Sequence, residues 1–221
     1  QNITSQNYSA IVGGANNGAT GDSSFIGGGN SNVVGGTYSI IGGGSNNNIS
    51  GGIFYGAICG GSSNTITGGY SFVGGGSFNS IYSINSGISS GNLNNIYSDY
   101  SFIGSGVSNG LTGNASFIGG GELNRTNGAN TSIVGGAYNS TQSIYASIVG
   151  GFSNGATGQY SFIGGGGTNV ASGQYSTVGG GHANNATGLY SIIGGGATNV
   201  ASGQYSMLNG GRHNTATGNG S

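Results

Sequence analysis

Apolar positions recur in this chain with a period of fifteen residues. Residues 159–173 read QYSFIGGGGTNVASG and the next fifteen read QYSTVGGGHANNATG, so that the same pattern of apolar pairs and glycine runs returns in order. Short apolar runs bounded by turn residues are typical of strands. Each unit therefore predicts one short strand at YSFI and a second at NVA or NNAT, with a glycine-rich turn after the first strand and a Ser-Gly or Thr-Gly turn after the second.

The serine of YSFI is a marker that lets the units be counted. It recurs at Ser24, Ser39, Ser71, Ser86, Ser101, Ser116, Ser132, Ser147, Ser161, Ser176, Ser191, Ser206 and Ser221, and Gly56 takes its place where SGGIFYGAICGG carries two extra residues. The spacing is fifteen apart from single departures of fourteen, sixteen and seventeen. We therefore expect a single repeat domain over residues 1–221 with about 14 units.

Two apolar columns accompany the marker. The first lies two residues after it: Val12, Ile26, Ile41, Ile58, Val73, Ile88, Ile103, Ile118, Val134, Val149, Ile163, Val178, Ile193 and Leu208. The second, of small or aliphatic residues, includes Ala19, Val34, Ile66, Ile81, Ile96, Ala156, Ala171, Ala186, Ala201 and Ala216. We expect the two columns to face each other between two strand layers, where alanine suits a thin core.

An asparagine column also keeps its place relative to the marker in every unit. Its members are Asn17, Asn32, Asn47, Asn64, Asn79, Asn94, Asn109, Asn124, Asn139, Asn154, Asn169, Asn184, Asn199 and Asn214. Stacking in register would place these side chains above one another, where their amides can hydrogen-bond along the stack. The column therefore predicts a structural asparagine ladder beside the core.

These patterns predict an all-β fold. A unit of fifteen residues is too short for a pair of helices, and each glycine would cost about 1 kcal/mol inside a helix. One unit alone buries almost nothing, but stacked units pair strand on strand in parallel at about 4.8 Å. The predicted fold is a parallel β-solenoid of about 14 coils with a repeat of about 15 residues, in which corner glycines supply left-handed backbone angles.

Alternation along YSFI places aromatic side chains on the outside of the coil. If the serine and the isoleucine point inward, their neighbours point outward. The predicted aromatic interface includes Tyr160, Tyr175, Tyr190, Tyr205, Phe102, Phe117 and Phe162. A continuous apolar stripe exceeds what a soluble monomer usually exposes, so we expect copies of the same chain to cover it. An open platform for sugar rings is the alternative.

Charged residues are nearly absent, with 2 basic and 3 acidic side chains and a net charge of −1. Without a basic patch the chain cannot neutralise a phosphate backbone, which excludes nucleic acid as a partner. No apolar run approaches the roughly 18 residues that span a bilayer, so we expect no membrane insertion. The single cysteine, Cys59, lies in an apolar stretch and is predicted to be a buried thiol.

No catalytic, cofactor-binding or metal-binding residue is predicted. Asp22, Asp99 and Glu122 lie several units apart, whereas hydrolysis of a glycoside needs two neighbouring carboxylates. His182 and His213 would lie about 10 Å apart in the stack, too far for one metal ion. Asp22 and Asp99 precede the marker strand at a corner, which favours a turn-capping role. We therefore expect a non-enzymatic protein without a cofactor.

Threonines and serines at the second turn raise ice binding as a less favoured function. Their column contains Thr20, Thr67, Thr112, Thr157, Ser172, Thr187, Ser202 and Thr217. It is one residue wide, and Gly35, Tyr82, Tyr97, Asn127 and Gln142 interrupt it.

Asn-X-Ser/Thr sequons, the acceptor sites of N-glycosylation, occur along the chain. Those at Asn124 and Asn139 belong to the asparagine column and should be inaccessible. The candidates for glycosylation at the surface are Asn2, Asn7, Asn114, Asn130 and Asn185. The sequons weakly favour an extracellular setting.

The units YSFIGGGGTNVASG, ASIVGGFSNGATG and YSIIGGGATNVASG resemble the head repeats of trimeric autotransporter adhesins. They are still more similar to the Asn-Ala-Ser-Gly-Tyr-Ser repeats of phage tail fibres and related surface fibres. The resemblance covers nearly the whole chain and implies a left-handed β-roll that associates as a trimer, with an adhesive or structural role. The three-glycine run and the lack of a heptad stalk, a barrel anchor and a charged chaperone domain depart from those families.

The sequence thus leaves three functions open. An adhesive or receptor-binding fibre of a virion or cell surface, contacting a surface glycan or protein, is favoured over a structural filament or spacer, and both over an ice-binding protein. The segments that depart from the repeat, 50–56 and 82–98, are expected to bulge outward and to contact a partner. We expect the ends to be joined axially, by the next domain of a longer chain or by another subunit.

Overall fold

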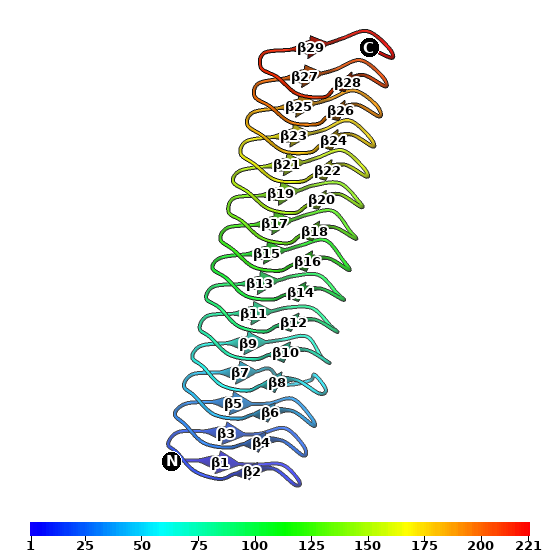
Figure 1. Cartoon of the computed structure of the whole chain (residues 1–221). Coiled ribbons are helices and arrows are strands. Elements are labelled where there is room, and N and C mark those ends of the chain that lie inside the picture. Colours follow the sequence, from blue (N-terminus) through cyan, green and yellow to red (C-terminus); the bar gives the residue numbers. More distant parts are fainter. The chain divides into compact units, whose positions relative to one another are not determined.

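The computed structural model describes all residues, 1–221, and consists of two-residue strands, isolated parallel β-bridges and turns. The strands form a parallel β-solenoid of about 14 coils with a repeat of about fifteen residues, as the sequence predicts (Figure 1). Each coil consists of an even-numbered strand, the glycine-rich first turn, an odd-numbered strand and the second turn, which leads to the next even-numbered strand. Successive coils therefore place odd on odd and even on even strands, so that each compact unit has two parallel sheets.

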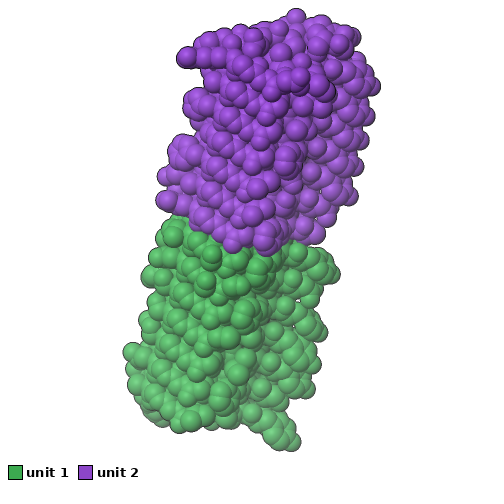
Figure 2. Space-filling view, in the orientation of Figure 1, with its two compact units in different colours: residues 1–108 green, residues 109–221 purple.

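The chain divides into two compact units, residues 1–108 and 109–221, which Figure 2 colours green and purple. In unit 1 the odd-numbered strands pair in the order β1 (Ile3–Thr4), β3 (Gly18–Ala19), β5 (Val33–Val34), β7 (Asn48–Ile49), β9 (Thr65–Ile66), β11 (Ser80–Ile81) and β13 (Asn95–Ile96). Its even-numbered strands pair in the order β2 (Ala10–Ile11), β4 (Phe25–Ile26), β6 (Ile40–Ile41), β8 (Ala57–Ile58), β10 (Phe72–Val73), β12 (Gly87–Ile88) and β14 (Phe102–Ile103).

Unit 2 repeats this arrangement. Its odd-numbered strands pair in the order β15 (Gly110–Leu111), β17 (Arg125–Thr126), β19 (Ser140–Thr141), β21 (Gly155–Ala156), β23 (Val170–Ala171), β25 (Asn185–Ala186), β27 (Val200–Ala201) and β29 (Thr215–Ala216). Its even-numbered strands pair in the order β16 (Phe117–Ile118), β18 (Ser132–Ile133), β20 (Ser147–Ile148), β22 (Phe162–Ile163), β24 (Thr177–Val178), β26 (Ile192–Ile193) and β28 (Met207–Leu208).

Burial follows the two-residue alternation within each strand. In β22, for example, Phe162 is 39% exposed whereas Ile163 is fully buried, and the other internal strands show the same order except β12, where Gly87 and Ile88 are both buried. The second apolar column is buried throughout, as predicted, with aliphatic residues in unit 1 and mainly alanine and threonine in unit 2. The core is therefore one side chain deep from each sheet.

The prediction that the first apolar column faces the core is wrong for three of its members. Val12, Val134 and Val149 are exposed at the surface. The inward position of their strands is held by the preceding isoleucines, Ile11, Ile133 and Ile148. Because side chains alternate along a strand, a shift of one residue moves a side chain to the opposite face.

In two of these coils, serine does not occupy the backbone position that it has elsewhere in the repeat. The buried place before the strand is taken by Thr131 and Ala146, while Ser132 and Ser147 point outward and hydrogen-bond to each other at 2.9 Å between their Oγ atoms. Residues 132 and 147 pair with 117 and 162 at the regular spacing. The departures of fourteen and sixteen therefore vanish, and the two-residue insertion is the single irregularity of register.

Left-handed backbone angles occur at three positions in a typical coil, of which one is a glycine. In the coil of β22 these three are Tyr160 (φ 58°), Gly166 (φ 84°) and Thr168 (φ 54°), and Gly165 (φ 156°) is an additional positive-φ residue of this coil. A Cβ at Gly166 would meet the carbonyl oxygen of Gly181 in the next coil, so glycine is required there. The expectation that corner glycines supply these angles is thus correct for Gly166 and wrong for the second turn, where tyrosine adopts the angle.

Cys59 is exposed, contrary to the prediction of a buried thiol. It follows the fully buried Ile58 directly, and the alternation along the strand carries the next side chain outward. The apolar letters around it therefore indicated a strand but not which of its faces Cys59 would occupy.

Candidate functional site

The asparagine column forms the tightest polar network of the coil. The fully buried Asn169 donates from Nδ2 to the carbonyl oxygens of Gly165, at 2.9 Å, and Gly181, at 2.9 Å. Nδ2 also lies 3.2 Å from Oδ1 of Asn154, and Oδ1 of Asn169 accepts the backbone N–H of Asn184 at 3.0 Å. One side chain thus bonds within its own coil and to the coils on both sides.

The other members of the column lie in the same place. Each unit has its own run, with Asn17, Asn32, Asn47, Asn64, Asn79 and Asn94 in unit 1 and Asn109, Asn124, Asn139, Asn154, Asn169, Asn184, Asn199 and Asn214 in unit 2. All are buried except Asn214, which lies in the last coil of the chain. Asn2, which sequence reasoning assigned to glycosylation, accepts the N–H of Asn17 at 3.0 Å and so makes the same bond.

The tyrosines of unit 2 form a stack on the outside of the second turn. Tyr145, Tyr160, Tyr175, Tyr190 and Tyr205 follow one another with ring centroids 4.7–5.1 Å apart and interplanar angles of 1–6°. Each ring is between 38% and 58% exposed. Because every one of these residues has φ between 57° and 60°, the backbone presents all the rings in the same direction.

Aromatic and aliphatic side chains also cover the outer face of the even-numbered strands. Phe102 in unit 1 and Phe117 and Phe162 in unit 2 are 39–40% exposed. We call the outer face of the even-numbered strands, together with the adjoining tyrosine column, the aromatic face of each unit. The odd-numbered strands present a more polar face, with Ser140, Asn185 and Thr215 in unit 2.

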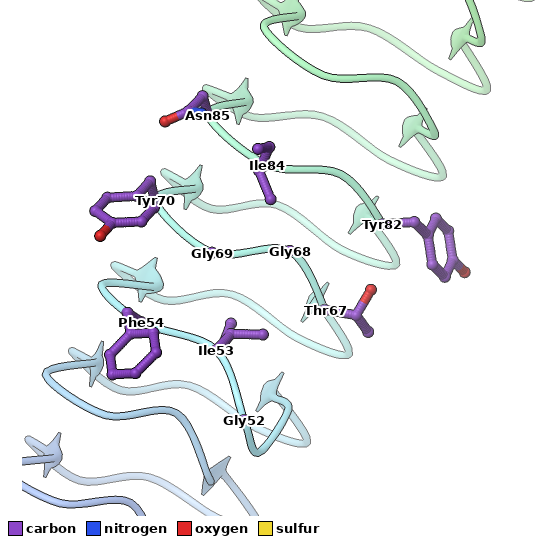
Figure 3. A pocket seen from close by; sticks show the side chains of 10 residues that line it. All are labelled: Gly52, Ile53, Phe54, Thr67, Gly68, Gly69, Tyr70, Tyr82, Ile84 and Asn85. Atoms are coloured by element: carbon purple, nitrogen blue, oxygen red, sulfur yellow. The ribbon is translucent and has the colours of Figure 1, made fainter.

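A cavity of about 440 Å³ opens on the second turn of unit 1 (Figure 3). Its lining comes from three consecutive coils: Gly52, Ile53, Phe54, Thr67, Gly68, Gly69, Tyr70, Tyr82, Ile84 and Asn85. In Figure 3 the bare backbone of Gly68 and Gly69 forms the floor, with Ile53 and Phe54 on one side along the stack and Ile84 on the other. We call this cavity the Gly69 hollow.

The hollow exists because one turn column lacks a side chain at a single coil. In each coil, the member of this column is the residue that directly precedes the positive-φ position of the second turn, which tyrosine often occupies. Phe54, Gly69 and Ile84 are its members in three successive coils. Elsewhere it contains Asn7, Asp22, Thr37, Asp99, Asn114, Ala129, Ile144, Gln159, Gln174, Leu189, Gln204 and Asn219. Gly69 is its one glycine, so a side-chain-sized gap separates two large apolar neighbours.

The two-residue insertion builds one wall of the hollow. Strand β8 pairs with β6 through Ile40 and Ala57, a separation of seventeen residues, and the extra residues leave the stack as a turn at 51–52. Ile53 then lies over Gly36 and Gly56, where an added Cβ would meet its side chain at 3.0 and 3.3 Å. The prediction of an outward bulge is confirmed at 50–56. It is wrong at 82–98, where β12 and β13 keep the regular register.

The polar side chains among the residues that line the hollow are uncharged. Thr67, Tyr70 and Tyr82 contribute hydroxyl groups and Asn85 contributes an amide. Asp99 follows Ile84 in the same turn column, one coil further along, and its carboxylate accepts the backbone N–H of Ile84 at 3.0 Å. Asp22 makes the corresponding bond to the N–H of Asn7 at 3.2 Å, so both carboxylates cap turns, as predicted.

The remaining sequence-derived candidates do not converge on a site. Asn7, Asn114 and Asn130 are exposed on the second turn, and Asn185 is half-buried on β25. His213 lies 2.8 Å from the Thr198 hydroxyl through Nδ1, and no three His, Cys, Asp or Glu side chains come together.

Comparison with known proteins assigns no family to this chain, because no family model and no curated protein sequence matches it. The structure contains no helix with the length and apolarity needed to cross a membrane. The candidate sites are therefore defined by geometry alone: the aromatic face, which recurs along both units, and the Gly69 hollow, which occurs once in unit 1.

Proposed function

We propose that this chain is a non-enzymatic attachment protein of an extracellular, cell-surface or virion fibre. The observation that carries the proposal is the aromatic face, on which exposed rings recur at the spacing of the coils on an almost uncharged scaffold. Its partner in this proposal is a surface glycan.

Repeated aromatic rings suit the contact of a fibre with sugars. A tyrosine ring offers an apolar surface for the C–H groups of a sugar and a hydroxyl group at its tip. A single such contact is weak, but identical contacts along a rigid array bind together with an effective concentration set by their spacing. The tyrosine stack of unit 2 supplies such an array without a charged residue in it.

The resemblance to autotransporter heads and phage fibres supports the same function. Those proteins are fibres with adhesive or structural roles, and their β-rolls are left-handed trimers. We include the left-handed coil and the trimer in the proposal. In a trimer part of the aromatic face would be covered by copies of the chain and the rest would remain open to a ligand.

A glycan array with the isolated chain tests the attachment function. Tyr175→Asn combined with Tyr190→Asn removes two rings but keeps residues suited to left-handed angles, since Asn85 and Asn130 occupy the same position. The loss of two stacking contacts, about 1 kcal/mol each, predicts a weakening of binding of more than tenfold. Val170→Asn with Val200→Asn on the polar face is the matched control, because Asn185 occupies that column.

A purely structural filament is the second candidate, favoured by the apolar character of the same face. Ile40 and Phe72 in unit 1 and Ile192 and Met207 in unit 2 extend this surface and are 36–52% exposed. A spacer would associate through this face and bind no glycan. Analytical ultracentrifugation and the array together separate the two: a trimer that is silent on every glycan supports the spacer.

A further inference from the structure

We propose that the Gly69 hollow is a binding site for one neutral pyranose ring at the end of a surface glycan. The hollow is a site of its own, separate from the tyrosine stack of unit 2. The proposal deepens the attachment function by naming a ligand class and a place, and its test distinguishes failure at the hollow from failure of attachment in general.

The size of the hollow fits a single sugar ring. Phe54 and Ile84 come from coils on either side of Gly69, and backbones two strands apart in a stack are separated by about 10 Å. A ring inserted midway would lie about 5 Å from each wall, the separation at which stacked rings are in contact. The volume of about 440 Å³ lies in the range of small-molecule sites.

The lining matches the two surfaces of a sugar. Phe54, Ile53 and Ile84 offer apolar walls to the C–H groups of a pyranose. Tyr70 and Tyr82, which carry hydroxyl groups, and Asn85, which carries an amide, are also lining residues, and the Thr67 hydroxyl, which donates to the carbonyl of Ile81 at 3.4 Å, can also accept a bond. A sugar can hydrogen-bond to these polar side chains and an alkyl chain cannot, which makes the sugar the better occupant.

The charge of the lining selects among sugars. The ten lining residues include no aspartate, glutamate, lysine, arginine or histidine, and the nearby Asp99 carboxylate accepts the backbone N–H of Ile84. An anionic sugar would lose its hydration on entering without gaining a cation in return. The hollow is therefore expected to take neutral hexoses or N-acetylhexosamines and to reject sialylated or sulfated ones.

The hollow is also pre-formed by the backbone. Gly69 is held from both sides, because Tyr70 donates its N–H to Phe54 at 2.8 Å and Asn85 donates its N–H to Gly69 at 3.1 Å. The floor consequently does not have to be ordered when a ligand enters, which lowers the entropic cost of binding.

The test is a titration of the intact chain with methyl glycosides of neutral hexoses and N-acetylhexosamines, in which saturation-transfer NMR measures binding. Gly69→Gln fills the hollow with the side chain that Gln159, Gln174 and Gln204 carry at the same turn position. We expect at least tenfold weaker binding in this variant and unchanged binding in Ala129→Gln, the matched control in unit 2. Tyr82→Ala, which removes one polar side chain from the lining, should weaken binding less than Gly69→Gln does.

Three results would overturn the proposal: no neutral glycoside binds the wild-type chain, Gly69→Gln binds as tightly as wild type, or anionic sugars bind more tightly than neutral ones. Equal circular dichroism melting curves for Gly69→Gln and Ala129→Gln establish that a loss of binding is local. If sugar binding is lost in Tyr175→Asn with Tyr190→Asn but not in Gly69→Gln, the attachment function stands and the hollow is not the binding site. The reverse result retains the hollow and removes the tyrosine stack.

Discussion

The amide of a buried asparagine bonds each coil to the next. At Asn169 the amide nitrogen faces three acceptors, the carbonyls of Gly165 and Gly181 and the Oδ1 atom of Asn154. Asparagine is the smallest side chain that combines two N–H donors with an acceptor oxygen. Serine or threonine in its place would leave carbonyls of the first turn unpaired, which explains why the residue recurs in every coil.

Replacement of Asn169 by aspartate is therefore expected to destabilise unit 2 by several kcal/mol, on the order of 3. The carboxylate oxygen in place of Nδ2 would face three acceptors, and the buried charge would have no cation beside it. Asn130→Asp, at an exposed position of the turn, should change the unfolding free energy by less than about 0.5 kcal/mol. Chemical denaturation and hydrogen exchange of the neighbouring coils measure both variants, and equal losses would contradict the role of the column.

Other residues show where the sequence falls short. The asparagine column could be read directly, because no other residue type competes for its place. The positive φ angles of the tyrosines could not be predicted, because bulky residues rarely adopt positive φ and the amino-acid sequence does not give backbone angles directly. The tyrosine rings of unit 2 contact those of the neighbouring coils at 4.7–5.1 Å between centroids.

At the scale of the coil, backbone position matters more than residue identity. Thr131 and Ala146 hold the place of the marker serine, and with them the register in unit 2 is regular throughout. Following the serines led instead to an apparent slip of one residue, which placed Val134 and Val149 on the wrong face. Two-residue strands make such errors easy, since each strand has only one inward residue.

The Gly69 hollow could have been located from the sequence only with the register in hand. Gly69 stands among many glycines in the chain and has no signature of its own. It becomes distinctive once the turn column is aligned through the seventeen-residue coil, because every other member of that column has a side chain. The chemistry of the walls then depends on Phe54 and Ile84, which are distant in sequence from one another.

Deletion of Gly52 and Ile53 tests whether the insertion serves the hollow. The remaining residues read Ser50, Gly51, Phe54, Tyr55 and Gly56, which match the turn TGGYS at 67–71 and return the coil to fifteen residues. The shortened turn should fold with an unfolding free energy within about 1 kcal/mol of the wild type, because closing a slightly shorter loop changes little. Sugar binding in unit 1 should be lost.

Differential scanning calorimetry and the glycoside titration measure these two effects in the same sample. The deletion leaves Gly69 and Ile84 unchanged, so loss of binding without loss of stability would assign the insertion to the site. A variant that melts far below wild type would show instead that Ile53 is needed for the packing around Gly36 and Gly56.

At the scale of the molecule, the sequence predicts the coil and its period but not what the coil binds. Period and burial follow from alternation inside each fifteen-residue unit, and both units obey it. Handedness and the partner of the aromatic face depend on small turn angles and on surfaces outside the chain, neither of which leaves a periodic signal. The resemblance to fibre repeats bears on these points and remains the basis of a proposal.

The near absence of charge makes a prediction about how the molecule associates. With 2 basic and 3 acidic residues in the chain, we expect attachment and self-association not to depend on ion pairs. Between about 0.1 M and about 1 M salt the Debye length falls from about 10 Å to about 3 Å, which weakens charge-mediated binding strongly. Apolar contact through the aromatic face should stay constant or strengthen in a salting-out salt such as sulfate.

Sedimentation velocity across this salt range, together with glycan binding at each salt concentration, measures the effect. The single exposed thiol of Cys59 accepts a fluorophore for detection at low protein concentration. Constant or tighter association in sulfate, lost on Tyr175→Asn with Tyr190→Asn, would place the contact on the stacked rings of unit 2. Association that weakens steeply with salt would point instead to Arg125, Arg212 or the acidic residues, and the aromatic face could then not be the contact surface.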